Sequence, residues 1–83
     1  MILTGRQIRE GRLLAGMEQA DLARDAGVAL GLVVRIEAVD GMAMMRKPDG
    51  VAIRSVLEAA GVDFIPENCG GAGVRLRKAG ASE

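Results

Sequence analysis

Aromatic residues are almost absent from this sequence. Of its 83 residues only Phe64 is aromatic, and there is no Trp or Tyr. The core must therefore be built from Leu, Ile, Val, Ala and Met, and a chain this short has only a thin core. Because a second copy would add buried area, we expect a homodimer. The apolar fraction of 49% and charged fraction of 27% are typical of a folded globular protein rather than a disordered one.

Histidine is missing and Cys69 is the only cysteine. A Cys/His zinc site and an internal disulfide are thereby excluded, and we expect no cofactor. A lone thiol suits a reducing compartment, and no apolar run reaches membrane-spanning length. The sequence therefore predicts a cytoplasmic protein without membrane contact.

The sequence also lacks a net charge and any recognisable catalytic pattern. Eleven cations balance eleven carboxylates, so contact with nucleic acid would depend on a local group of cations. The glycine-rich stretch 69–73 lies between expected strands rather than ahead of a helix, which excludes a phosphate-binding loop. Arg6 with Glu10, and Arg54 with Glu58, have the spacing of ordinary helix surface pairs. We expect neither an enzyme nor a small-molecule ligand.

Apolar residues recur at helical spacing in the first 61 residues and predict four helices. The first covers about 5–15, opened by a capping box of Thr4 and Gln7 and closed by Gly16. The second covers 19–25 and the third about 29–39, which we expect to run on to Gly41. Asp49 is expected as the N-cap of the fourth. The expected inner residues are Ile8, Gly11, Leu14, Ala15, Leu22, Ala23, Ala26, Val33, Ile36, Ile53, Val56, Leu57 and Ala60.

After Gly61 the period changes to alternation, which predicts a β-hairpin with strands Val62 to Ile65 and Val74 to Arg77. The expected fold class is mainly α, with a four-helix domain over 1–61 and a hairpin and tail over 62–83. A two-stranded hairpin is barely stable alone, so it should lie on the helices or pair with a second copy. We expect it to be the dimerisation element.

The stretch 8–40, "IREGRLLAGMEQADLARDAGVALGLVVRIEAVD", resembles the Xre-type helix-turn-helix family, the small repressors of phages and bacteria. The resemblance covers about two fifths of the chain and rests on the spacing of separate elements. It weakens after residue 61, where the family usually continues with a fifth helix. The matching residues are Arg12, Gly16, Gln19, Leu22, Ala23, Ala26, Gly27, Val28, Arg35, Ile36 and Glu37.

The resemblance implies a sequence-specific DNA-binding regulator, a dimeric repressor that places its third helix in the major groove. It also implies an ion pair between Arg12 and Glu37, which would fix the placement of two helices. It assigns contacts with double-stranded DNA to the start and outer face of the third helix and to flanking polar residues. The expected DNA-binding residues are Gln19, Arg24, Ala29, Leu30, Gly31, Leu32, Arg35, Arg46 and Lys47.

The chain departs from the family pattern where DNA is normally touched. Ala29 stands in place of the usual Ser N-cap, and Leu30, Gly31 and Leu32 cannot form side-chain hydrogen bonds. Leu30 and Leu32 could contact thymine methyl groups while Arg35 contacts guanine, and Gly31 would let the backbone come close. An apolar stripe of Leu30, Leu32 and Val34 could equally bind another protein. It could also pack against the chain's own loop, which is rich in methionine.

Phosphate contacts would come from the start of the second helix at Gln19, and from Arg24, Arg46 and Lys47. The run Arg75, Arg77 and Lys78 could grip phosphate, protect a strand edge or stay in solvent. The alternative to a DNA-binding regulator is a protein-interaction module on the same scaffold, a co-regulator or an antitoxin that has lost DNA reading.

Overall fold

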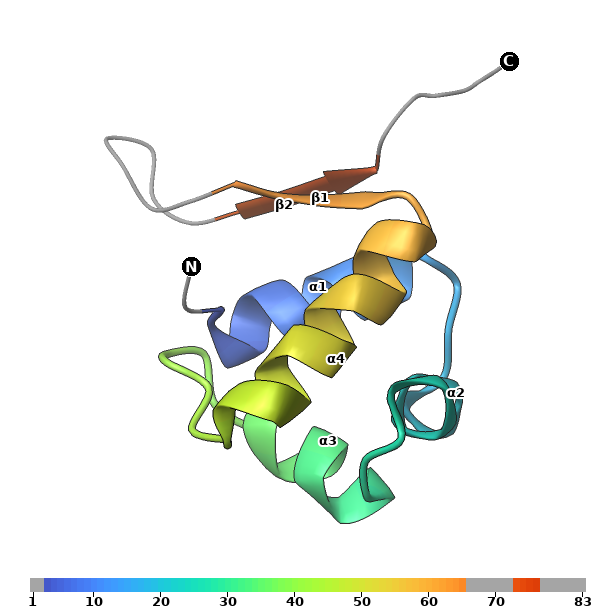
Figure 1. Ribbon diagram of the computed structural model, residues 1–83. Helices are drawn as coiled ribbons and strands as arrows, with labels where there is room; N and C mark the ends of the chain where they lie inside the picture. Colours follow the sequence, from blue (N-terminus) through green and yellow to red (C-terminus); the bar gives the residue numbers. More distant parts are fainter. Residues whose placement is uncertain (1–2, 66–72, 77–83) are drawn as a thin grey trace.

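The computed structural model describes residues 3–65 and 73–76, which form four helices followed by a two-stranded antiparallel sheet (Figure 1). The expected class, mainly α with a C-terminal hairpin, is confirmed. The elements are α1 (Gly5–Leu14), α2 (Gln19–Ala26), α3 (Leu30–Glu37), α4 (Lys47–Ala59), β1 (Val62–Ile65) and β2 (Gly73–Leu76).

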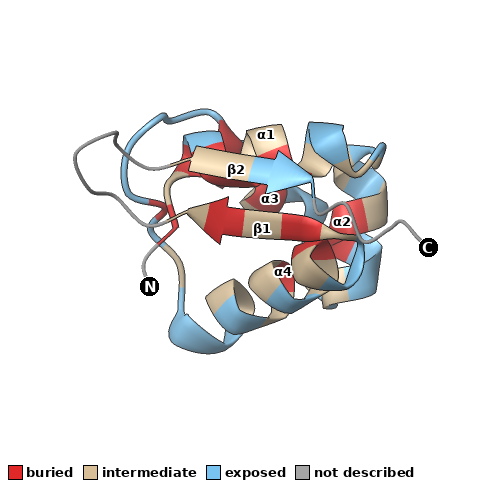
Figure 2. Cartoon of the chain, turned by 90° about the horizontal axis from the view of Figure 1, so that it is seen from above, coloured by how far each residue is buried: buried red, intermediate tan, exposed pale blue. Residues whose placement is uncertain are grey.

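The hairpin lies across α1 and α4, and α2 and α3 lie at the opposite end of the molecule (Figures 1 and 2). The core fills the space where these elements meet. Its largest fully buried side chains are Ile8, Leu22, Val33, Ile36, Ile53, Leu57 and Val62. Two residues expected inside are instead exposed, namely Leu14 and Ala60, because each lies at the end of its helix. Within the described residues, no helix has the length and apolar character needed to cross a membrane.

The expected capping box at the start of α1 and the glycine ends of α1, α2 and α4 are confirmed. The Thr4 hydroxyl oxygen accepts a hydrogen bond from the Gln7 backbone N–H, and the Gln7 side-chain oxygen accepts one from the Thr4 N–H, both at 3.0 Å. Gly16, Gly27 and Gly61 have φ angles of 71°, 70° and 97°. A side chain strongly disfavours this left-handed region, so glycine at these positions ends each helix.

The third helix ends at Glu37, so the expectation that it continues to Gly41 is wrong. The chain turns there because residues 41–43 run beside the N-terminal segment. The Gly5 N–H donates to the Gly41 carbonyl at 2.8 Å, and the Ala43 N–H donates to the Leu3 carbonyl at 3.1 Å. This pairing of distant segments overrides the local preference for more helix.

The fourth helix begins at Lys47, three residues earlier than expected, and Arg46 takes the N-cap position that was assigned to Asp49. Pro48 explains the difference. Its ring fixes φ near the helical value, and its missing N–H would have had no partner in the first turn. Asp49 lies inside that first turn, where its carboxylate suits the positive end of the helix dipole.

The inner face of the hairpin completes the core of the same chain. Val62 and Phe64 are buried against α1 at Gly11, where an added Cβ atom would lie 3.2 Å from Val62 Cγ1 and 3.5 Å from Phe64 Cε1. In the sheet, Val62 pairs with Leu76 and Phe64 with Val74. The second strand starts one residue earlier than expected, and its expected last residue, Arg77, lies outside the described part of the chain.

Gln7 joins α1 to the end of the hairpin where Ile65 pairs with Gly73. Its side-chain nitrogen donates to the carbonyls of Ile65 at 3.2 Å and Gly73 at 3.1 Å, while its side-chain oxygen completes the capping box. Only 2% of Gln7 is exposed. A single buried amide therefore joins the start of the first helix to both strands.

Candidate nucleic-acid interface

The third helix is held by its inner face and by its last turn. Val33 and Ile36 are fully buried in the core. At the C-terminal end, Arg9 donates from Nη1 to the Glu37 carbonyl at 2.7 Å and from Nη2 to Asp40 Oδ1 at 2.8 Å. The hydrogen bond from Arg9 holds the pKa of the Asp40 carboxyl below its usual value. The helix is thereby fixed relative to α1.

A buried network around Glu37 links α3 to both α1 and α2. Arg12 donates from Nε and Nη2 to the two carboxylate oxygens of Glu37, and Gln19 donates from Nε2 to Glu37 Oε1 at 3.1 Å. Only 12% of the Arg12 side chain and 3% of the Glu37 side chain are exposed. Hydrogen bonding to Glu37 raises the pKa of the Arg12 guanidinium. The expected Arg12–Glu37 pair is confirmed.

No part of the chain that the structure describes covers the outer face of α3. Leu30 and Val34 are each 47% exposed, and Gly31 and Arg35 are exposed beside them. A Cβ atom added at Gly31 would meet nothing within 4 Å. Leu32 lies on the other side of the helix, half-buried against the core. The expected stripe is corrected accordingly: Leu30 and Val34 form an apolar outer face, and Leu32 is not part of it.

The methionine-rich loop after α3 does not cover this face. Met42 and Met44 are 57% and 67% exposed, and only Met45 packs against the core. Packing of the outer α3 face on the chain's own loop, one of the three alternatives, is therefore wrong for Leu30 and Val34.

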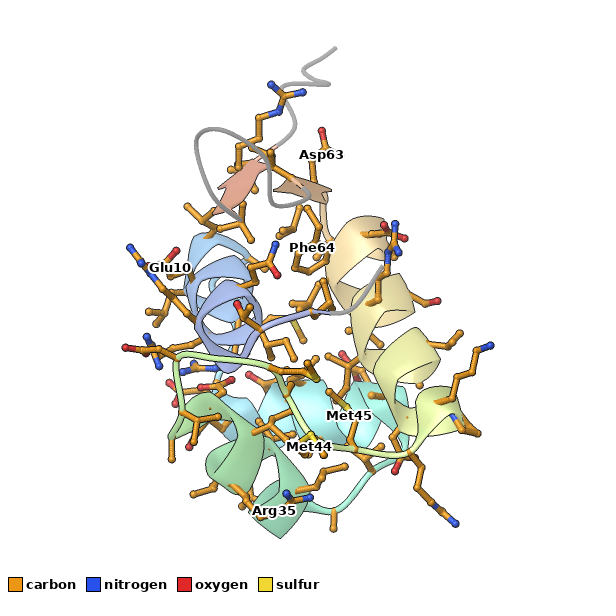
Figure 3. All side chains as sticks on the ribbon, turned by 90° about the vertical axis from the view of Figure 1, so that its left-hand side faces the viewer. Glu10, Arg35, Met44, Met45, Asp63 and Phe64 are labelled. Atoms are coloured by element: carbon orange, nitrogen blue, oxygen red, sulfur yellow. The ribbon has the colours of Figure 1, made fainter. Side chains whose placement is uncertain are left out.

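Arg35 is the only charged side chain on the outer face of α3. Its Nη1 donates to the backbone carbonyl of Met44 at 3.2 Å, so one of its five N–H groups is directed toward the loop. Figure 3 shows Arg35 at the outside of α3, with the loop that carries Met44 and Met45 beside it. The loop thereby helps to set the position of this guanidinium, a link that no local feature of the sequence signals.

The expected phosphate-binding cations differ in how far neighbouring carboxylates neutralise them. Arg24 forms ion pairs with Asp21 and Asp25, each at 3.2 Å. Its pKa is raised, chiefly by the hydrogen bond to Asp25. Arg46 has 85% of its side chain exposed and lies 3.9 Å from Asp49. Of these expected cations, Arg46 is therefore less neutralised by neighbouring carboxylates than Arg24.

The remaining expected contact residues are placed as follows. Lys47 is exposed as the first residue of α4. Ala29 is the exposed N-cap of α3 and forms no side-chain cap bond. The side chain of Gln19 is held by Glu37, so its position at the start of α2 leaves mainly backbone N–H groups facing outward. Lys78 and Cys69 lie outside the described residues.

Two further observations bear on the type of site. No group of three or more potential metal-ligating side chains occurs within residues 3–65 and 73–76. No family model matches the chain, and no curated protein is significantly similar to it.

Proposed function

We propose that this chain is a dimeric DNA-binding transcriptional regulator, similar to the Xre-type repressors, that reads the major groove with α3. The observation that carries the proposal is the outer face of α3, which is uncovered while the opposite side of the helix is fixed by the network around Glu37. A reading helix must be both exposed and firmly placed, because base contacts tolerate little displacement.

The chemistry of that face suits one polar contact and several apolar ones. Arg35 can donate two hydrogen bonds to O6 and N7 of guanine. Leu30 and Val34 can contact thymine methyl groups, which are an apolar feature of the major groove. Gly31 adds no side chain, so the helix backbone can approach the base edges closely. The proposed site therefore prefers a guanine flanked by thymines.

The backbone contacts come from a small number of cations. Arg46 and Lys47 in each of two protomers would neutralise about four phosphates, so the logarithm of affinity should fall against the logarithm of salt concentration with a slope of about −4. Arg24 adds little because three carboxylates, those of Glu18, Asp21 and Asp25, lie on the same helix or at its cap.

A second copy of the chain fits the side of the molecule where α1 meets β2. Leu13, Leu14 and Leu76 are 62%, 43% and 49% exposed there, beside Val74. A two-fold dimer through this surface would cover them and would pair the outer edge of β2. Two reading helices about one DNA turn apart then favour a palindromic operator.

The test is binding to duplex DNA from upstream of the chain's own gene, measured by fluorescence anisotropy at low and high salt. Specific binding should weaken by about 10- to 100-fold in Arg35→Ala, the loss expected for one bidentate base contact. Arg6→Ala, an exposed change on α1, is the matched control. Replacing thymine by uracil in the site should weaken binding of the wild type more than that of Leu30→Ala.

A protein-interaction module is the second candidate, favoured by the exposed Leu30, Val34 and Met44 and by the neutralised Arg24. If this second candidate is correct, the chain binds no DNA duplex specifically. A partner protein then binds the wild type but does not bind Leu30→Glu. Specific DNA binding that depends on Arg35 would rule this candidate out as the main function.

A further inference from the structure

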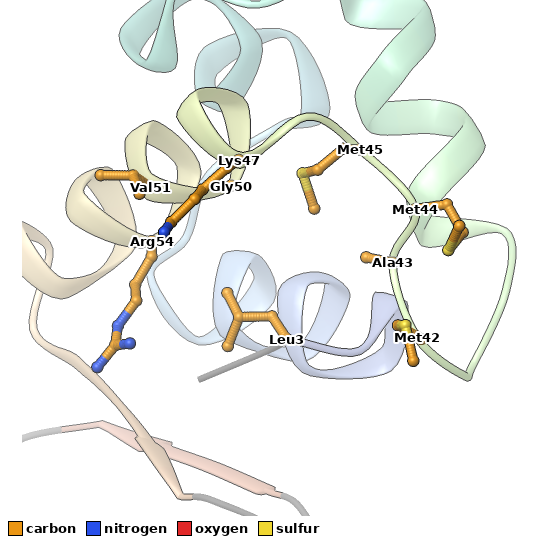
Figure 4. Close-up of a pocket in the computed structure, with 9 residues that line it drawn as sticks. All are labelled: Leu3, Met42, Ala43, Met44, Met45, Lys47, Gly50, Val51 and Arg54. Carbon is orange, nitrogen blue, oxygen red and sulfur yellow. The ribbon is translucent and has the colours of Figure 1, made fainter.

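A hollow of about 470 Å³ opens between the N-terminal segment, the loop after α3 and the first turns of α4 (Figure 4). This volume is within the range of about 300–1,000 Å³ that holds small organic ligands. Methionine side chains are flexible and polarizable, so the wall can adapt to an apolar guest. The apolar lining residues are Leu3, Met42, Ala43, Met44, Met45 and Val51.

The charged side chains that line this hollow, among the described residues, are all positive. Lys47 and Arg54 line it, and none of its described lining residues is acidic. Arg54 also bonds Glu58 at 2.8 Å, whereas Lys47 is exposed at the start of α4. An apolar wall with cations on one side matches a molecule that has an apolar body and an anionic head.

The hollow is connected to the proposed reading face through the loop. One end of the loop is anchored, because Ala43 and Gly41 are hydrogen-bonded to Leu3 and Gly5. The next residue, Met44, contributes to the wall of the hollow and its carbonyl accepts the hydrogen bond of Arg35. A guest that shifts the backbone at Met44 would therefore change or break the bond that positions Arg35.

We propose that a small amphipathic carboxylate, such as a medium-chain fatty acid, binds in this hollow and lowers DNA affinity by moving Met44 and with it Arg35. The regulatory half of the proposal rests on the proposed function, whereas binding itself does not. No pattern in the sequence indicates such a site, because its wall combines Leu3 with residues 42–54, which lie far from it in the chain.

Binding is tested first, without DNA, on the full chain carrying ¹³C-labelled methionine methyl groups. Decanoate is the probe, and decyltrimethylammonium of equal chain length is the control. We expect saturable shifts of the Met44 and Met45 methyl signals with decanoate, at least tenfold weaker binding in Lys47→Glu, and no saturable shift in Gly50→Leu, whose side chain fills the hollow. Gly50→Ala serves as the folding control.

Absence of a saturable shift, or equal binding of the cationic amphiphile, would overturn the site. The coupling is then tested by measuring DNA affinity with and without saturating decanoate. A loss of at least threefold in the wild type but not in Gly50→Leu supports it. Saturable binding with unchanged DNA affinity overturns the coupling alone, and a chain that binds decanoate but no DNA overturns the proposed function instead.

Discussion

Arg12 donates two hydrogen bonds to Glu37, from Nε to Oε2 at 2.8 Å and from Nη2 to Oε1 at 2.9 Å. Arg12 lies on α1 and Glu37 on the last turn of α3. The pair therefore joins two helices through residues that are 25 positions apart in the sequence. Gln19 on α2 donates to the same carboxylate. Three helices therefore depend on one buried acid for their mutual placement.

Removing that acid should be costly. Glu37→Ala leaves Arg12 buried without its counter-charge, and we expect a loss of about 3 kcal/mol in the free energy of unfolding. The measurement is urea unfolding followed by circular dichroism. Glu10→Ala is the matched control, because Glu10 pairs with Arg6 at the surface and its removal should hardly move the midpoint. Equal effects of the two changes would contradict a structural role for the buried pair.

Two glycines in helices should respond in opposite ways to alanine. At Gly50 the added Cβ would meet only Met45 Sδ at 3.8 Å, an ordinary contact, so Gly50→Ala should stabilise by about 0.5–1 kcal/mol. At Gly5 the added Cβ would overlap the backbone carbonyl oxygens of Ile36 and Val39. Gly5→Ala should therefore lower the melting temperature, while Gly50→Ala raises it. A Gly5→Ala protein as stable as the wild type would disprove the close approach.

Protonation of Asp40 at low pH should lower the free energy of unfolding. The hydrogen bond from Arg9 lowers the pKa of Asp40 in the folded state, so its unfolded form binds a proton at higher pH. The stabilisation that Asp40 contributes is thus fully present above the pKa of Asp40 in the unfolded chain. It is lost as the pH falls through the lower pKa of Asp40 in the folded chain. Unfolding measured between about pH 5 and pH 2 should show a shallower decline for Asp40→Asn than for the wild type. A carboxyl NMR titration that gives Asp40 an ordinary pKa would contradict this.

The dimer surface should be separable from the reading face. Leu13→Glu puts a carboxylate into the apolar contact between copies, which should raise the dimer dissociation constant by about a hundredfold. Leu30→Glu, at the opposite side of the molecule, should leave it unchanged. Sedimentation velocity gives both results. A Leu13→Glu protein that remains dimeric would place the interface elsewhere.

Truncation is a poor test of the hairpin as a dimerisation element. Val62 and Phe64 are buried in the core, so deleting residues 62–83 would expose α1 at Gly11 and the facing side of α4. We expect that truncated chain to unfold rather than to become a folded monomer, which circular dichroism would show. If the truncated chain stayed helical and melted cooperatively, the hairpin would contribute little to the fold.

Local chemistry in the sequence was enough to predict much of the fold. The Thr4 and Gln7 capping box and the glycines after three helices act within a few residues, so their effect does not depend on distant parts of the chain. Proline at position 48 is also a local signal, but the carboxylate of Asp49 next to it offered a competing N-cap, and the start of α4 was misplaced by three residues.

Features that depend on distant segments could not be predicted. The end of α3 follows from the bonds between residues 41–43 and Leu3 to Gly5. The opposite placement of Leu30 and Leu32, by contrast, could have been predicted, because residues two positions apart on an α-helix point about 200° apart. Of the candidate site, the Arg12–Glu37 pair followed from resemblance, whereas the bond from Arg35 to Met44 had no local signal.

The placement of Phe64 over Gly11 gives this protein a built-in spectroscopic reporter. With one aromatic ring in the chain, a ring-current shift at the Gly11 α-protons has a single source. Separation of the hairpin from α1 would return those protons to ordinary chemical shifts, independently of any unfolding of α2 or α3. Detachment of the sheet can therefore be followed at one resonance, without a label or a substitution.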